Sequence, residues 1–315
     1  MYTIYDFVFG ITYGQAQVHC CFHDDTKASA GISPDGAYNC FACGAKASNE
    51  EGFIANYFDV SLKKAKSIKE RLLVADKYIP TSNPLTAEQI KYLNSIGISN
   101  AILQKYFICQ SNGKLIYRHM WNGLFLASTW FNADSLSTYN AGEPKYKYQG
   151  VIGGLCTPYD DVVRYNSLLI CEGEKDMLTA KSMGIPNAVA KVGGAQTPII
   201  SGINFDNKNI IICYDCDDAG REGAAKDAAM LIEKHNCKVK VIDLGLNDKE
   251  DLNDYFVKYK HTKDDLLALM KSTPLYVIPP EYKKTKVEKI LESLTQDELI
   301  ELKQKINNLG GTNNE

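Results

Sequence analysis

The chain has 315 residues, 45% of them hydrophobic and 23% charged, and a formal net charge of −3. These values are ordinary for a soluble protein of about two domains. No run of about eighteen apolar residues is present, which argues against a membrane span. The first residues lack the basic and apolar segments of a secretion signal, so we expect a cytoplasmic protein. The near-neutral charge is only weak evidence against nucleic-acid binding, because a local basic strip can hold a strand.

The first expected element is a small metal-binding domain over residues 1–58. A C-x₂-H pair at Cys20 and His23 is followed by a C-x₂-C pair at Cys40 and Cys43. Two residues between ligands let the chain curl so that both side chains reach one ion. Such pairs are suited to tetrahedral Zn²⁺ with no open position, so we expect a structural zinc site.

Alternatives to this zinc site remain open. The cysteines can be ordinary buried residues, although two short ligand pairs so close together disfavour that interpretation. His19 or Cys21, which flank the first pair, can replace one of its ligands. A disulfide scaffold is disfavoured, because the 10 cysteines are too few and too scattered in a chain of this length.

The next elements are helical and then strand-rich. Apolar residues at helical spacing, with lysines opposite, predict a helix at 59–75. Two prolines predict a linker at 76–84, and a second globular unit is expected from residue 85. It begins with helices at 86–96 and 99–106 and continues as strand-rich chain at 115–131, with hairpin turns at Asn112-Gly113 and Asn122-Gly123.

From residue 168 the pattern alternates between strands and helices. Short apolar runs predict strands at 167–171, 188–192, 209–214 and 238–244, with helices at 176–183 and 220–235. The alternation is typical of a parallel sheet with crossover helices and predicts the α/β fold class. After Pro279-Pro280, a capping box at Thr295 and Glu298 predicts a short amphipathic helix.

Two of these strands end in acidic residues. The first runs into Glu172, and the third runs into Asp215 and Asp217. Sites in open α/β sheets form at the carboxyl ends of strands, so we expect these acids to converge. Two carboxylates about 4 Å apart repel by roughly 4 kcal/mol at an effective dielectric near 20, so the cluster predicts a bound cation. Mg²⁺ and phosphate chemistry fit such a cluster; a solvated turn at each strand end is the alternative.

The order of these motifs resembles that of the zinc-finger plus TOPRIM DNA primases, which include bacterial replicative primases and the primase half of phage primase–helicases. The cysteine motifs are similar to the family's C-P-F-H and C-F-G-C-G, although Cys21 stands in the usual proline position. Glu172-Gly173-Glu174-Lys175-Asp176 and Asp215-Cys216-Asp217 resemble the phage form of its acidic motifs. The resemblance covers residues 15–258. The arginine–glycine run of the bacterial polymerase domain has no clear match.

This resemblance implies an α/β protein with a small zinc-ribbon domain and a TOPRIM-type parallel-sheet polymerase domain. The expected division is a zinc-binding domain at 1–58, a helix and linker at 59–84, a primase polymerase domain at 85–275 with a TOPRIM subdomain at about 166–258, and a helical tail at 276–315.

The resemblance also implies site residues. The catalytic acids are Glu172, Asp215 and Asp217, and these with Asp251 are the expected ligands of Mg²⁺ or Mn²⁺. Glu250 or Asp254 can take the place of Asp251, and the choice stays open. Asp176 is expected to organise the turn after Glu172 instead.

Basic and aromatic residues predict the nucleic-acid contacts. Lys145 and Lys147 alternate with tyrosines, a pattern suited to gripping a backbone and stacking on bases, although a solvated loop fits equally. Arg118 is a weaker candidate for triphosphate contact. Tyr38 and Phe41 are expected either to stack on single-stranded DNA or to cover the zinc hairpin.

The function that the resemblance implies is the synthesis of short RNA primers from NTPs on a single-stranded DNA template. No G-x-x-x-x-G-K-[ST] motif occurs, so a replicative helicase is expected in trans, with the tail as a docking element or a helix packed on its own domain. The expected location is the bacterial cytoplasm if the chain is phage-encoded. Alternatives are a TOPRIM nuclease and a catalytically silent, zinc-dependent DNA-binding replication adaptor.

Overall fold

The computed structural model describes residues 2–11, 16–74, 79–80, 82–106, 108–131, 146–150, 153–200, 202–283, 294, 298–300, 302–303 and 305. The chain forms two compact units, Met1–Tyr276 and Val277–Glu315, and the sites described below lie in the first. Within the described ranges, no helix combines the length and apolar character needed to cross a bilayer. The capping-box residue Thr295 falls outside those ranges.

A small antiparallel sheet organises the N-terminal region. Its strands pair in the order β1-β2-β3-β4. They are β1 (Ala16–Val18), β2 (Ala30–Ile32), β3 (Tyr38–Cys40) and β4 (Lys46–Ala47), with α1 (Ile4–Phe9) before them and α2 (Glu50–Phe58) and α3 (Leu62–Leu72) after them. Helical spacing predicts α3 but not α2. Helix α2 depends on an N-cap, in which the Asn49 side chain accepts from Gly52 N, and on the buried aromatic residues Phe53 and Tyr57.

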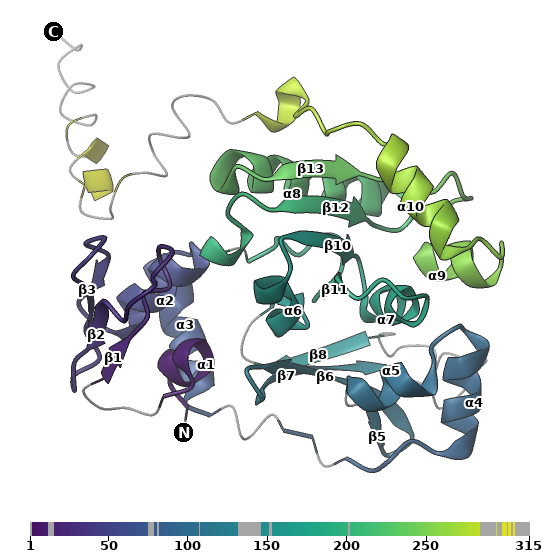
Figure 1. Ribbon diagram of the computed structural model, residues 1–315, viewed down its shortest axis with the longest axis horizontal. Helices are drawn as coiled ribbons and strands as arrows, with labels where there is room; N and C mark the ends of the chain where they lie inside the picture. Colours follow the sequence, from purple (N-terminus) through teal and green to yellow (C-terminus); the bar gives the residue numbers. More distant parts are fainter. Residues whose placement is uncertain are drawn as a thin grey trace, which may run out of the picture. The chain divides into compact units, whose positions relative to one another are not determined.

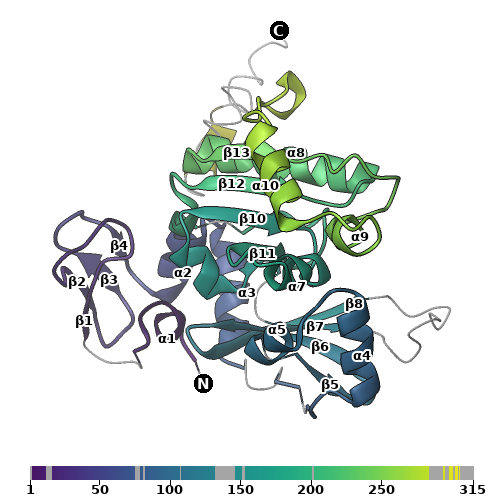
Figure 2. The ribbon, with the colours of Figure 1, turned by 45° about the vertical axis from the view of Figure 1, so that its right-hand side comes forward.

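A second antiparallel sheet follows in the order β5-β6-β7-β8 (Figure 2). Its elements are α4 (Ala87–Ser95), α5 (Asn100–Lys105), β5 (Cys109–Ser111), β6 (Lys114–Trp121), β7 (Leu124–Phe131) and β8 (Tyr146–Gly150). Both predicted Asn-Gly turns are present. Asn112 and Gly113 have φ of 49° and 80°, and Asn122 and Gly123 have 49° and 77°, values that asparagine and glycine tolerate best.

The third sheet has the order β13-β12-β10-β11-β9. Its strands are β9 (Cys156–Thr157), β10 (Ser167–Cys171), β11 (Ala188–Lys191), β12 (Asn209–Cys213) and β13 (Lys238–Val241). Strands β10 to β13 pair in parallel, as their hydrophobic runs predict, and β9 pairs with β11 in antiparallel. The α/β fold class is therefore confirmed.

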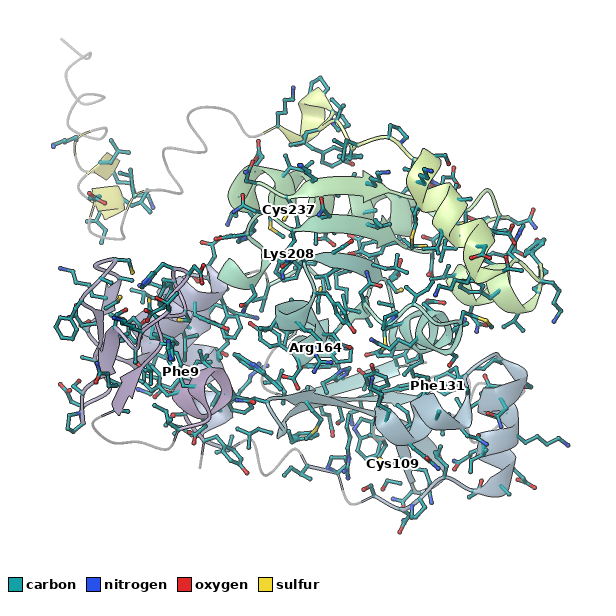
Figure 3. All side chains as sticks on the ribbon, in the orientation of Figure 1. Phe9, Cys109, Phe131, Arg164, Lys208 and Cys237 are labelled. Carbon is teal, nitrogen blue, oxygen red and sulfur yellow. The ribbon has the colours of Figure 1, made fainter. Side chains whose placement is uncertain are left out.

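Helices cover both faces of this sheet (Figure 1). They are α6 (Tyr159–Arg164), α7 (Glu174–Ser182), α8 (Asp218–His235), α9 (Leu252–Val257) and α10 (Lys263–Ser272). Along β10, Leu169 and Cys171 face the core that contains α7 and α9, whereas Leu168 and Ile170 face the core that contains α8. Because both faces are covered, the neighbouring strands β10 and β12 carry continuous hydrophobic runs, whereas the edge strand β13 alternates lysine with valine. Side chains fill the space between the strands and the helices (Figure 3).

The N-terminal core also includes residues from later in the chain. Trp121 of β6 packs on Tyr159 with ring centroids 4.1 Å apart and stacks on Tyr57 of α2 at 5.9 Å. The amide of Asn204 donates to the hydroxyls of Tyr57 and Tyr159 at 2.8 and 2.6 Å. Residues of β6, of helix α6 and of the turn at Asn204 therefore complete the N-terminal core.

Candidate functional site

The predicted cysteine–histidine ligands lie together. One ligand atom from each of Cys20, His23, Cys40 and Cys43 falls within 4.8 Å of the others. The Sγ atoms of Cys20 and Cys43 are 3.7 Å apart, and His23 Nδ1 is 3.9 Å from Cys40 Sγ. His19 and Cys21 do not join this group. Three thiols and one imidazole in this arrangement have the composition of a structural Zn²⁺ site.

Hydrogen bonds from the chain itself organise this cluster. The Asp25 carboxylate accepts from Cys20 N at 2.6 Å and from the hydroxyl of Ser29 at 2.8 Å. These bonds, chiefly the one from Cys20 N, lower the pKa of Asp25 to about 2. Tyr38 donates its hydroxyl to Cys20 Sγ at 3.0 Å. Ligand side chains held by such outer contacts are fixed in orientation before metal binds.

The thiol pKa values differ within the cluster. Burial raises the pKa of Cys20 to about 11. Burial also acts against ionisation of Cys40, but hydrogen bonds from the backbone N–H groups of Cys43 and Ala42 and from Ser29 lower its pKa to about 6. Since the thiolate is the metal-binding form, Cys40 is prepared for ligation.

The two aromatic residues predicted to contact DNA differ in exposure. Tyr38 is 1% exposed and packs beneath the cysteine cluster. Phe41 is 82% exposed and borders a shallow groove of about 400 Å³ beside Ile32 and Asn39. Of the pair, Phe41 is the side chain available for stacking on a base.

A cleft forms where the parallel strands end. Strands β10 and β12 are neighbours, with Cys171 opposite Cys213, so the residues that follow them lie side by side. The Glu172 carboxylate accepts from Asp215 N at 3.2 Å and from Ala195 N at 3.3 Å. The acids at the two strand ends converge because the register of the two strands brings them there.

Carboxylates from three elements meet in this cleft. One oxygen each from Asp176, Asp215 and Asp251 lies within 4.8 Å of the others, which makes this group a candidate cation site. Asp176 lies in the first turn of α7 and accepts from Asn253 N at 3.0 Å. Its expected role in the turn is thus extended to membership of the acidic cluster. The signal for this was its position four residues past Glu172, in the first turn of the helix that follows β10.

The acids near residue 251 take separate positions. Asp251 caps α9, accepting from Asp254 N at 2.9 Å, and its second carboxylate oxygen is paired with Lys175. Asp254 reciprocates in the capping box, with Asp251 N donating to it at 3.3 Å. Glu250 is paired with Lys258 and accepts from Asn247 N at 2.8 Å. Among these three acids, Asp251 is the one in the cluster.

Asp217 stands at the edge of this arrangement. Its side chain caps α8 by accepting from Gly220 N at 2.7 Å. It does not belong to the group formed by Asp176, Asp215 and Asp251. Its charge nevertheless contributes to the raised pKa of Glu172. A role for Asp217 as a direct metal ligand stays a prediction.

The cleft raises the pKa values of its carboxyl groups. Burial, followed by the charges of Glu172 and Asp251, raises the pKa of Asp215 to about 7. Burial raises the pKa of Glu172, and burial with the charge of Asp251 raises that of Asp176. Such shifts arise when like charges share a poorly solvated site. A divalent cation in the cleft would remove the repulsion that produces them.

The cleft has a volume of about 410 Å³ and a mixed lining. Besides the acids, it is lined by Thr129, Tyr146, Tyr148, Lys175, Lys191, Gly193 and Gly194. Tyr146 and Tyr148 come from β8, and Phe131 of β7, labelled in Figure 3, packs on Tyr146 with ring centroids 5.3 Å apart. Two aromatic rings beside an acidic cluster can stack on nucleobases.

The predicted basic residues lie elsewhere. Lys145 is outside the described residues. Lys147 is exposed on β8, and strand alternation places it on the opposite face from Tyr146 and Tyr148. Arg118 lines a separate cavity of about 210 Å³ and donates to Ser82 and to the Pro80 carbonyl. Neither described residue reaches the acidic cleft, so their nucleotide contacts stay predictions.

A buried network that the sequence did not predict joins the second sheet to the cleft. The Glu174 carboxylate accepts from Thr129 Oγ1 at 2.6 Å and lies 3.2 Å from His119 Nε2. His119 Nδ1 lies 2.9 Å from Thr157 Oγ1. Burial acts against ionisation of Glu174, but the hydrogen bond and charge of His119 lower its pKa. This network fixes the start of α7, which carries Asp176.

A family model matches the region that contains the acidic cleft. Residues 169–256 match the family described as Toprim-like. The DNA primase of Listeria monocytogenes is 34% identical over 82 residues, 26% of this chain and 13% of that protein. The DNA primase of Geobacillus stearothermophilus is 38% identical over 89 residues, 28% of this chain and 15% of that protein. The predicted resemblance to Toprim-containing primases is confirmed for this segment, although the chain spans a small part of the length of these relatives.

Two solved structures cover more of the chain at lower similarity. The zinc-binding and RNA polymerase domains of Aquifex aeolicus primase match with a TM-score of 0.47 and 18% identity, covering 83% of this chain and 79% of that one. The primase fragment of the bacteriophage T7 primase-helicase protein matches with a TM-score of 0.41 and 17% identity, covering 81% of this chain and 99% of that one.

Proposed function

We propose that this protein is a DNA primase, which joins ribonucleotides into short RNA primers on a single-stranded DNA template. The observation that carries the proposal is the carboxylate group of Asp176, Asp215 and Asp251, whose oxygens lie within 4.8 Å of one another beside Glu172. The group lies in the segment that matches the Toprim-like family. The proposal keeps the expected division into a zinc-binding domain at 1–58, a linker region at 59–84, a polymerase domain at 85–275 and a tail at 276–315.

The donor set of the cleft fits Mg²⁺ or Mn²⁺. These ions prefer carboxylate oxygens, and burial together with the charges of Glu172 and Asp251 raises the pKa of Asp215 to about 7. We assign the metal to Asp176, Asp215 and Asp251, with Glu172 of the same cleft as a fourth ligand and Asp217 as a further acid outside the cleft lining. When bound, the metal supplies charge neutralisation of the triphosphate and a lowered pKa of the attacking hydroxyl.

The protein's own groups bind and orient the substrates in this proposal. Tyr146 and Tyr148 line the cleft, where they can stack on the bases of the template or the incoming nucleotide. Lys175, paired with Asp251, supplies positive charge at the cleft wall. The backbone of Gly193 and Gly194 has no side chain that would block the approach of a phosphate.

The cysteine–histidine region supplies template contact in this proposal. Zn²⁺ held by Cys20, His23, Cys40 and Cys43 would fix the hairpin that carries Phe41. The exposed ring of Phe41 can stack on an unpaired base, and the groove beside it can receive a neighbouring one. The remaining partners are NTPs and a replicative helicase acting in trans, in the cytoplasm of a bacterial cell.

A priming assay tests the proposal. Protein with single-stranded DNA, four NTPs and Mg²⁺ should give short RNA products. Asp215→Ala should abolish them while single-stranded DNA binding changes by no more than about twofold. The matched control is Asp218→Ala, since Asp218 is exposed and lies outside the acidic group.

Other outcomes identify the alternatives. Nicking of plasmid DNA without any NTP-dependent product would contradict primer synthesis and indicate a Toprim nuclease. Tight binding of single-stranded DNA without any chemistry would indicate an adaptor. The acidic group argues against the adaptor, because an adaptor gains nothing from gathering carboxylates that raise one another's pKa.

A further inference from the structure

A fully buried ion pair lies beneath the acidic cleft. Lys191, the last residue of β11, has a side chain 0% exposed, and its partner Asp227 on α8 has one 5% exposed. Their Nζ and Oδ2 atoms are 2.5 Å apart. Tyr214, next to Asp215, donates its hydroxyl to the same carboxylate at 2.7 Å, and Lys191 Nζ lies 4.5 Å from the centre of its ring. Buried charges are costly unless paired in this way.

The pair holds a loop that borders the cleft. The ammonium of Lys191 donates to the Ala195 carbonyl at 2.8 Å, and Asp227 Oδ1 accepts from Ile199 N at 3.3 Å. Both ends of the segment 195–199 are therefore attached to one ion pair. Helix α8 also packs closely on this loop, since a Cβ atom at Gly223 would lie 2.5 Å from the Ala195 carbonyl oxygen.

The loop in turn holds a catalytic acid. The N–H of Ala195 donates to Glu172 at 3.3 Å, while the carbonyl of the same residue accepts from Lys191. The carboxylate of Glu172 has one further backbone donor, Asp215 N. A displacement of Ala195 would therefore change the position of Glu172 directly.

Lys191 is not available to bind substrate itself. Its ammonium already contacts Asp227, Ala195 and the face of Tyr214, and its side chain has no exposed surface. Its positive charge lowers the pKa of Glu172, and its hydrogen bonds hold the loop. The variant Thr197→Val, which keeps this charge, separates the two effects.

We propose that Lys191 and Asp227 are positioning residues, which fix the 193–199 loop so that Ala195 N–H holds Glu172 in place for metal binding. The inference rests on the proposed function of the acidic cleft. It assigns a role to the Gly193-Gly194 segment as well, because its positive φ angles, 103° and 74°, direct the chain from β11 into the loop.

The test measures Mn²⁺ affinity, which needs neither DNA nor nucleotides. Zinc-loaded full-length protein is titrated with Mn²⁺, and free ion is followed by electron paramagnetic resonance. The variant Lys191→Met/Asp227→Asn removes both charges together, so neither is left buried without a partner. We expect its Kd for Mn²⁺ to rise about tenfold, the usual effect of removing a group that orients a ligand.

A second buried pair provides the matched control. Lys181 and Asp161 have side chains 1% and 10% exposed, and their Nζ and Oδ2 atoms are 2.7 Å apart. The hydrogen bonds described above that hold the 193–199 loop involve neither residue. Lys181→Met/Asp161→Asn should leave the Kd for Mn²⁺ within about twofold of wild type. An equal loss in both double variants would overturn the positioning role.

A milder variant covers the case in which the first one does not fold. Thr197 Oγ1 donates to the Gly193 carbonyl at 2.6 Å, so Thr197→Val loosens the same loop without touching a buried charge. We expect Mn²⁺ binding about threefold weaker with unchanged circular dichroism. If the Lys191→Met/Asp227→Asn variant folds and binds Mn²⁺ with wild-type affinity, the inference is rejected. If that variant does not fold, wild-type Mn²⁺ affinity in Thr197→Val rejects it. Failure of the wild-type protein to bind Mn²⁺ would instead reject the proposed metal site.

Discussion

The two candidate metal sites of this protein are built in opposite ways. The cysteine–histidine cluster draws all its ligands from residues 20–43, within one small sheet. The acidic group takes Asp176, Asp215 and Asp251 from the starts or ends of separate elements of a larger sheet. The ligands of the first site are close together in the sequence, whereas those of the second come together only when the parallel strands pair in register.

The carboxylates of the two regions show the same contrast. Hydrogen bonds lower the pKa of Asp25 to about 2, so its charge is already satisfied by the chain. Burial and like charges raise the pKa of Asp215 to about 7, so the chain does not stabilise the charged form of this carboxylate. The contrast is therefore between a carboxylate whose ionised form is stabilised by the chain's own hydrogen bonds and one whose ionised form the folded chain disfavours, as expected of a group that receives a cation.

The largest expected effect comes from removing a thiol ligand. Cys40→Ala should reduce bound zinc to near zero and expose the N-terminal region to proteolysis, because metal binding contributes on the order of 10 kcal/mol to the folding of such sites. Zinc content by mass spectrometry and limited trypsin digestion measure the change. Cys21→Ala is the control and should retain zinc, since Cys21 lies outside the cluster. A fully zinc-loaded Cys40→Ala protein would refute the ligand assignment.

The next effect tests the acid that sequence reasoning placed in the turn. Asp176→Asn should abolish Mn²⁺ binding to the cleft and lower the priming rate about a hundredfold, which corresponds to a loss of about 3 kcal/mol of transition-state stabilisation. The zinc content should not change, because the two sites share no ligand. Exposed Asp218, changed to Asn, should behave as wild type. Normal Mn²⁺ affinity in Asp176→Asn would remove this residue from the site.

A pH experiment tests the raised pKa of Asp215, which burial and the neighbouring carboxylates produce together. The folded state holds the Asp215 proton more tightly than the unfolded chain, with a pKa of about 7 against 3.8, so the stability that this group contributes is present below pH 3.8 and lost as the pH rises through 7. In metal-free buffer at pH 8, Asp215→Asn should therefore be more stable than wild type, by about 2 kcal/mol after allowance for solvent screening of this partly exposed group.

Thermal unfolding between pH 4 and pH 8 checks this sign. The stability difference should close as the pH falls toward 4, and Mg²⁺ should stabilise the wild type alone. A variant that is less stable than wild type at pH 8 without metal would show that the cleft carries no net repulsion at Asp215.

The smallest effect concerns the outer contacts of the zinc site. Tyr38→Phe removes the hydroxyl that donates to Cys20 Sγ at 3.0 Å and should cost about 1 kcal/mol. Zinc release to a chelator should become several-fold faster. Tyr5→Phe is the matched control, because its hydroxyl belongs to the same core and donates to the Gly36 carbonyl at 2.9 Å. Equal release rates in the two variants would mean that the Tyr38 bond does not support the cluster.

Local chemistry made much of this protein predictable. Ligand spacing predicted Cys20, His23, Cys40 and Cys43, because two residues between ligands suffice to bring them to one ion. The Asn-Gly turns and the apolar runs that end in Glu172 and Asp215 depend on a few neighbouring residues as well. The turns depend on backbone preference, and the apolar runs depend on burial of both faces of a strand. Both features can be read from a single short segment of the sequence.

Other features were decided only by the tertiary structure. Asp176 joined the acids because α7 packs beside α9, and Lys191 became a buried cation because α8 brings Asp227 to it. The N-terminal core includes Trp121 and Tyr159, and no local sequence pattern indicated this. These contacts join residues far apart in the chain, and their energy depends on burial and pairing that no local pattern encodes.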